Sequence, residues 1–187
     1  MASHGATPHS PCRATRIWLV LSLGLLAPSI GVWLLRGTAF AFHCVPGPQP
    51  CSALPAWMPL GQSLRGALDL AWALALNDNL LLAGGIAAAV AALCARRPVA
   101  AFVSAVSLAP ASLLLPVLAV SSATYAGCAA NEGGVGDCRL WGTSMGMSFH
   151  NAAVAPWVLY TLAPYCAAAA VMLGLVGLIF VRRRTAQ

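Results

Sequence analysis

Seven cysteines are the residues of this 187-residue chain best suited to covalent chemistry. Four of them form two pairs, Cys44 with Cys51 and Cys128 with Cys138, each within a Gly- or Pro-rich stretch. Pairing within each stretch is the simple arrangement and closes two short loops, but a cross-loop pairing is equally allowed, since four cysteines permit three connectivities. Such bonds would constrain loops that have no core of their own. Three other cysteines are predicted to be free thiols: Cys12, Cys94 and Cys166.

A second group of candidate ligands lies beside the cysteine pairs. Met145, Met147 and His150 follow the second pair closely, and His43 directly precedes the first. Thioether sulfur and imidazole nitrogen are ligands for copper. Methionine also fills irregular apolar gaps, and this spacing matches no defined metal motif. Apolar packing is the interpretation we prefer, a copper site is the alternative, and we expect no cofactor.

Three consecutive polar residues, Asn77, Asp78 and Asn79, interrupt an otherwise apolar segment. Asp78 lies 18 residues before Arg96, or about 27 Å along a helix. That depth favours a hydrated triplet near a membrane interface that caps a break in the helix. The alternative is a functional acid that relays protons or binds a cation. Small residues at Gly85 and four positions later predict a close helix contact.

The composition places these groups in a membrane protein. The chain is 60% hydrophobic and 7% charged, whereas soluble domains carry about 25% charged residues. Apolar segments long enough for a hydrocarbon layer of about 30 Å lie at about 17–35, 72–94, 99–123 and 158–181. The sequence predicts an all-α integral membrane protein, a four-transmembrane-helix bundle forming a single domain over 1–187. Its two disulfide-bearing outer loops would cover about 37–69 and 124–151, and neither shows an alternating strand pattern.

Arginine placement predicts the orientation. Seven arginines fall on one side if the chain crosses four times: Arg13, Arg16, Arg96, Arg97, Arg182, Arg183 and Arg184. The positive-inside rule puts that side, with both termini, in the cytoplasm. We therefore expect a multi-pass protein of the plasma membrane, or of the inner membrane in a Gram-negative cell. The net charge of +6 then reflects topology, and no nucleic acid is expected as a partner.

The first apolar segment has an alternative interpretation as a cleaved signal peptide. The stretch from Thr38 to Ala41 resembles a cleavage site. Signal peptides have apolar cores of about 7–15 residues, whereas this run has 19 and is separated from the site by Arg36. Those features favour a retained helix. Cleavage would leave three helices in the same orientation.

Two of the apolar runs are longer than one bilayer, since His150–Val181 and Leu64–Cys94 contain 32 and 31 residues. We predict that the second and fourth helices bend or protrude at their outer ends and carry a compact cap. The third helix contains Pro110 and Pro116, which a membrane helix tolerates when neighbours satisfy the freed carbonyls. Three tryptophans should lie near the base of the cap: Trp57, Trp141 and Trp157.

Four helices, cytoplasmic termini and a cysteine pair in each outer loop form a layout similar to that of the quinone-linked disulfide oxidases. Those enzymes use C-x-x-C in the first loop, whereas six residues separate Cys44 from Cys51 here, so no catalytic residue is carried over. Claudin-like tetraspan proteins share the topology and a first-loop cysteine pair, but their tryptophan-rich motif before that pair is absent.

Among catalytic signatures, the chain contains no G-x-S-x-G, no H-E-x-x-H and no phosphate-binding glycine loop before a lysine. We therefore expect a non-catalytic accessory, assembly or interaction subunit. Its partners would be the lipid bilayer and other membrane subunits or a second copy of the chain. The alternatives are a membrane thiol–disulfide oxidoreductase that uses the outer-loop cysteines, and an ion or solute translocation subunit that uses Asp78.

Overall fold

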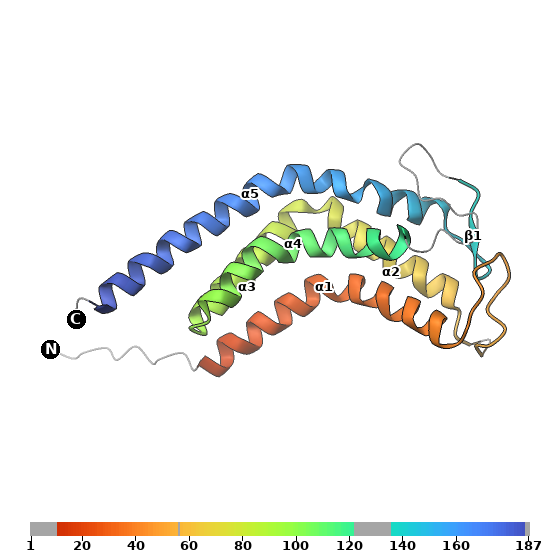
Figure 1. Ribbon diagram of the computed structural model, residues 1–187, viewed down its shortest axis with the longest axis horizontal. Coiled ribbons are helices and arrows are strands. Elements are labelled where there is room, and N and C mark those ends of the chain that lie inside the picture. Colours follow the sequence, from red (N-terminus) through yellow and green to blue (C-terminus); the bar gives the residue numbers. More distant parts are fainter. Residues whose placement is uncertain (1–10, 56, 122–135, 186–187) are drawn as a thin grey trace.

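The computed structural model describes residues 11–55, 57–121 and 136–185, and helices make up most of this part of the chain. Figure 1 shows the helices as one elongated bundle, in which α1 starts and α5 ends at the end opposite β1. The predicted all-α class is confirmed. The elements are α1 (Pro11–Ala41), α2 (Leu60–Leu76), α3 (Asp78–Cys94), α4 (Pro98–Ser121), β1 (Arg139–Leu140), β2 (Thr143–Ser144) and α5 (Gly146–Thr185).

Helix α4 is central, because it packs against each of the other four helices. Small side chains make up much of its buried face, among them Ser104, Ala105 and Ala109, and they let neighbouring backbones approach closely. A Cβ atom built on Gly85 of α3 would lie only 3.8 Å from the carbonyl oxygen of Ser104. Gly85 and Ala89 are both buried, which confirms the predicted small-residue contact.

Prolines lie inside three of the helices without ending them. Pro28 lies in α1, Pro110 and Pro116 lie in α4, and Pro156 and Pro164 lie in α5. Proline kinks a helix because it lacks an N–H and its ring crowds the preceding turn. Figure 1 shows these three helices curving in the same sense, so that the whole bundle is bowed.

One backbone carbonyl freed by a proline is satisfied by a neighbouring helix. Pro116 has no N–H to donate to the carbonyl of Ser112, four residues earlier. The Ser29 hydroxyl of α1 donates to that carbonyl oxygen at 3.1 Å, and both serines are buried. The predicted compensation for Pro116 is therefore confirmed, and it joins α1 to α4 at the kink.

The second apolar segment consists of two helices, which corrects the prediction of one helix over 72–94. Helix α2 ends at Leu76, α3 begins at Asp78, and their axes differ by 85°. The Asn77 side chain accepts a hydrogen bond from the Leu80 N–H at 3.1 Å, as an N-cap does. This confirms the interpretation that the polar triplet caps a break, and it confirms the bend predicted for this segment.

Helices extend into both predicted outer loops. Helix α1 continues to Ala41, α2 begins at Leu60, and α5 begins at Gly146. The extensions of α2 and α5 follow the long apolar runs Leu64–Cys94 and His150–Val181, whereas the first turn of α2 lies before the run and carries the exposed Gln62. The part of the first loop outside helices is therefore 42–59, and a short β-hairpin lies in the second, where no strand was expected.

A tight turn joins α3 to α4. Arg96 has a φ of +61°, and its N–H and that of Arg97 donate to the carbonyls of Leu93 and Ala92. This is a Schellman motif, which satisfies carbonyls at the end of a helix. The Arg97 guanidinium lies 5.9 Å from the centre of the Trp18 ring, so the turn is fixed against α1.

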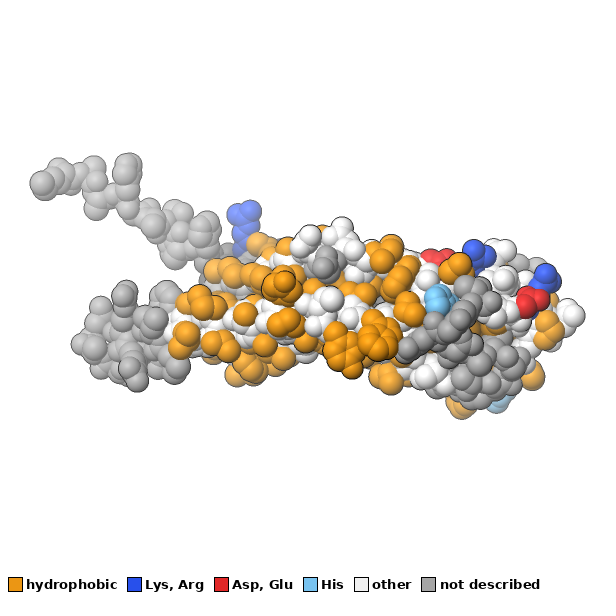
Figure 2. Space-filling view, turned by 90° about the horizontal axis from the view of Figure 1, so that it is seen from above, with side chains coloured by type: hydrophobic (Ala, Val, Ile, Leu, Met, Phe, Trp, Pro, Cys, Tyr) orange, Lys and Arg blue, Asp and Glu red, His pale blue; other side chains and the backbone are white. Residues whose placement is uncertain are grey.

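The helices are long and their outward faces are apolar. Three described helical stretches are long and apolar enough to cross a membrane, and the bent α2–α3 pair would be a fourth if it forms one broken span. Figure 2 shows apolar side chains over the middle of the bundle and charged side chains at its ends. Several long apolar helices are compatible with a membrane protein.

We expect Ser29→Ala to lower the free energy of unfolding by about 0.5–1.5 kcal/mol, because it leaves the Ser112 carbonyl without a donor. In a Pro116→Ala background the backbone N–H of residue 116 can take over, so the same change should cost almost nothing. Denaturant titration of the four proteins of this double-mutant cycle measures the difference. An equal cost in both backgrounds would show that the serine does not compensate for the proline.

Candidate functional site: the disulfide ring and its tryptophan

The end of the bundle opposite the start of α1 carries a cap, which we define as residues 42–59 and 136–145. Cys44 and Cys51 form a disulfide within it, with a Cα–Cα distance of 5.3 Å, so the predicted pairing is confirmed. The bond closes a ring that includes Pro46, Pro48 and Pro50. Three alternating prolines remove N–H donors from the ring, which leaves it rich in carbonyl acceptors.

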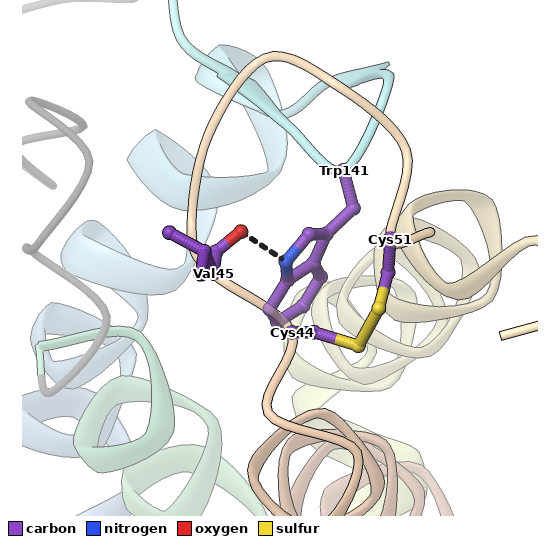
Figure 3. The surroundings of a disulfide bond; sticks show 4 residues. All are labelled: Cys44, Val45, Cys51 and Trp141. Carbon is purple, nitrogen blue, oxygen red and sulfur yellow. Dashed lines mark hydrogen bonds between the residues drawn. A yellow bond between two sulfur atoms is a disulfide. The ribbon is translucent and has the colours of Figure 1, made fainter. Parts of the chain in front are cut away.

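Trp141 fills this ring. It lies with Gly142 at the tip of the β1–β2 hairpin, where their φ values are +47° and +79°. Two positive φ values are typical of a type I′ turn, whose twist matches that of the paired strands. Figure 3 shows the indole inside the loop that the disulfide closes, with its nitrogen directed at the Val45 carbonyl. Only 9% of the Trp141 surface is exposed.

Three N–H groups of the hairpin tip donate to carbonyls of the ring. The indole Nε1 donates to Val45 at 3.3 Å, and the backbone nitrogens of Trp141 and Gly142 donate to Gly47 and Pro48 at 2.8 and 3.1 Å. The proline-rich ring supplies acceptors and the turn supplies donors, so the two surfaces are complementary. This contact joins segments nearly 100 residues apart in the sequence.

The hairpin also packs closely on α2. A Cβ atom built on Gly61 would lie 2.6 Å from Thr143 Oγ1, and within 2.8 Å of the carbonyl oxygens of Leu140 and Trp141. Only glycine fits this position, because two of the three nearest atoms belong to the backbone. Gly61 therefore permits the close approach that seats the hairpin on the first turn of α2.

Polar contacts tie the cap ends of the helices together. Ser148 of α5 donates to Asp69 Oδ1 of α2 at 2.6 Å, and Arg65 lies 3.5 Å from the other carboxylate oxygen. Asp69 was placed at the end of the predicted outer loop of about 37–69, and this was wrong, because the residue lies within α2. Its carboxylate instead links α2 to the buried Ser148.

Arg36 of α1 caps the end of α4. Its guanidinium donates to the Ala119 carbonyl at 2.5 Å and lies 5.6 Å from the centre of the Trp33 ring. The last carbonyls of a helix have no partner within the helix and carry partial negative charge, so a cation is favourable there. This contact fixes the outer part of α1 against α4.

The four predicted copper ligands differ in their exposure. Met145 is fully buried, whereas Met147 is 55% exposed. His43 is exposed at the end of α1 with a φ of +50°, and His150 is half-buried on α5. Within the described ranges, no three His, Cys, Asp or Glu side chains are grouped to hold a metal ion. A copper site at these four positions stays a sequence-based hypothesis.

The remaining cysteines fall into three groups. Cys138 is disulfide-bonded, and Cys128, its predicted partner, lies outside the described residues. Cys94 is a free, exposed thiol and Cys166 a free, buried one, as predicted. Cys12 belongs to the first turn of α1, where its side chain lies outside the described part.

The intramembrane polar candidates separate into different roles. Asn77 caps α3 through its side chain. Asp78 is the first residue of α3, but its side chain lies outside the described part of the structure. Asn79 follows in the first turn and is exposed. The structure therefore assigns a helix-capping role within this triplet to Asn77.

Sequence reasoning did not identify Trp141 or Gly61 as site residues. The sequence signal for the first was indirect: a Trp-Gly pair in one loop and alternating prolines between two cysteines in the other. A type I′ turn usually has Asn or Asp before its glycine, so the pair alone does not predict a hairpin. Gly61 carries no local signal, because its neighbours come from a distant segment.

The chain matches no known protein family, no curated protein and no solved structure at a significant level. The arrangement itself shows a buried disulfide that supports a packed tryptophan. Cys44 is 8% exposed and Cys51 is half-buried. This geometry suits a structural bond, since a catalytic disulfide must be accessible to a thiolate.

We expect Trp141→Ala to expose the ring and to destabilise the cap by about 3–5 kcal/mol, as for other truncations of buried aromatic residues. The Cys44–Cys51 bond should then be reduced more than tenfold faster by a mild reductant. Alkylation followed by mass spectrometry measures that rate. Trp57→Ala is the matched control, because Trp57 is 76% exposed, and it should leave the rate unchanged. Equal rates in the wild type and Trp141→Ala would contradict the role of the indole.

Proposed function

We propose that this chain is a multi-pass protein of the plasma membrane that crosses the bilayer four times. The main support is the exposed apolar surface of its helices, since large residues such as Val20, Leu34 and Tyr165 face outward. In water such a surface would drive aggregation. Lipid chains cover this surface without exposing it to water. The bent α2–α3 pair then serves as one broken span, and Asn77 caps the backbone that the break frees.

Both termini are cytoplasmic in this proposal. Helix α1 starts, α5 ends and the α3–α4 turn lies at one end of the bundle, where the chain carries Arg13, Arg16, Arg96 and Arg97. The acids Asp69 and Asp137 belong to the other end, together with the cap. The cap then faces an oxidising compartment, in agreement with its disulfide.

Helix α1 is retained in this proposal and is not a signal peptide. Two contacts of α1 support its retention. Ser29 satisfies the carbonyl that Pro116 leaves free, and Arg36 caps the end of α4. Loss of α1 would leave both groups of α4 without these partners. The cleavage-like stretch itself forms the last turns of α1, and its Ala39 is buried.

Within the membrane, the chain acts as a non-catalytic accessory or interaction subunit, and its partner-binding surface is the cap. The observation that carries this proposal is the disulfide ring packed around Trp141, which builds a rigid outer surface with no free thiol among the described residues of the cap. Large apolar side chains remain exposed on that surface, with Val45 and Trp57 the most prominent. Rigid, exposed aromatic and apolar residues are typical anchors of protein interfaces.

The proposed topology predicts the labelling of a native thiol. Cys94 is exposed next to the Arg96 turn, so a membrane-impermeant maleimide should modify it only after intact cells are permeabilised. A cysteine introduced at exposed Gln62, at the cap end, should be modified without permeabilisation. Peptide mass spectrometry distinguishes Cys94 from Cys12. Modification of Cys94 in intact cells would reverse the orientation.

The proposed interaction role predicts specific crosslinks from the cap. A photo-reactive amino acid in place of Trp57 or Val45 should give an adduct of one discrete mass in living cells. The same amino acid in place of Leu34, which faces lipid in this proposal, is the control and should give no protein adduct. Two results together would favour the oxidoreductase alternative. The cap would give no protein adduct, and the Cys44–Cys51 bond would cycle between reduced and oxidised forms in the cell.

A further inference from the structure

A cavity of about 360 Å³ opens beside the disulfide ring. Its walls come from the last turns of α1, from the ring and from the hairpin, through Arg36, Ala39, Phe40, Pro46, Leu140 and Trp141. Arg36 is the single charged residue among these lining residues, and its aliphatic stem adds to the apolar wall. The volume falls within the range of sites that hold small ligands, roughly 300–1,000 Å³.

One face of α1 leads from the proposed membrane span into this cavity. Trp33, Arg36 and Phe40 are three and four residues apart, so they lie on the same side of the helix. Trp33 is partly exposed at the outer end of the span, where aromatic residues meet the headgroups. Phe40 lines the cavity and yet is 83% exposed. The apolar surface of the span is therefore continuous with the cavity wall.

The level of the cavity restricts what can occupy it. Arg36 directly follows the apolar run that ends at Leu35, so the cavity begins at the headgroup layer of the proposed topology. An apolar opening at that depth adjoins hydrocarbon chains that are present at very high local concentration. A water-soluble ligand would instead need several polar partners, whereas the side chains that line these walls are mostly apolar.

We propose that the cavity is a lipid-binding site that holds an acyl chain of a phospholipid from the outer leaflet. The chain would lie against Phe40, Leu140 and Trp141, and its polar end would leave the cavity at the level of Arg36. This inference rests on the proposed membrane topology, because it requires α1 to cross the bilayer up to Arg36. It assigns a lipid ligand to the same cap that we propose as an interaction surface.

Photolabelling of the full chain in phosphatidylcholine vesicles tests the proposal. A small fraction of the lipid carries a diazirine midway along one acyl chain, and labelled peptides are mapped by mass spectrometry. We expect label on the lipid-facing residues of α1 and α5, and also on Leu140 and Trp141 in the cap. Label on the helices without label on Leu140 or Trp141 would overturn the cavity proposal and leave the membrane proposal intact. Absence of label from the helices would contradict both.

A pair of matched variants separates specific binding from accidental contact. Ala39 lines the cavity, whereas Ala41 is exposed in the same last turn of α1 and does not line it. Ala39→Leu should lower the labelling of Leu140 and Trp141 about tenfold, because added methyl groups fill the space of the chain. Ala41→Leu should leave it unchanged.

If Ala39→Leu labels Leu140 and Trp141 as strongly as Ala41→Leu does, the proposal is overturned. Resistance of the Cys44–Cys51 bond to mild reductant verifies that each variant has folded its cap. If Ala39→Leu fails this check, the wild-type experiment still tests the cavity proposal, because absence of label on Leu140 and Trp141 would overturn it.

Discussion

The insertion of Trp141 into the ring closed by Cys44–Cys51 is the contact on which the cap depends. A short proline-rich loop has little core of its own, so the disulfide limits its unfolded conformations. The tryptophan adds buried apolar area and three hydrogen bonds from the hairpin tip. Because the hairpin packs in turn on Gly61, the same contact fixes the two loops to α2. Disulfide, tryptophan and glycine act as one unit.

The bundle below the cap follows a related principle, in which side chains satisfy backbone groups that are left unpaired at kinks, breaks and helix ends. Ser29 compensates for Pro116, Asn77 caps the start of α3, and Arg36 caps the end of α4. Unsatisfied backbone groups are costly away from water. These contacts therefore permit kinks and breaks in helices whose outward faces are apolar. They also explain why α1 is integral to the fold, since two of the three compensating side chains come from it.

Together these features concentrate the distinctive chemistry at one end of the molecule. The disulfide ring, the Ser148–Asp69–Arg65 contacts and the cavity beside Phe40 all lie at the cap end. A rigid apolar surface at that level would lie where lipid headgroups and partner subunits meet. The proposed interaction role and the proposed lipid site thus describe neighbouring parts of one surface, and a bound chain would stabilise the form of the cap that partners contact.

The sequence by itself determined the apolar helices and the break at Asn77, because hydropathy and capping propensity are local properties. It offered Cys44–Cys51 as the simple pairing, and the tertiary structure selected it from the connectivities that four cysteines allow. It also anticipated that a neighbour would satisfy a carbonyl freed by proline, but not that Ser29 would do so. Only the tertiary structure decided that Trp141 fills the disulfide ring, that Gly61 admits the hairpin, and that Asp69 binds Ser148. Each of these joins residues about 80 or more positions apart. No local pattern encodes such contacts, since they arise from how the helices pack around α4.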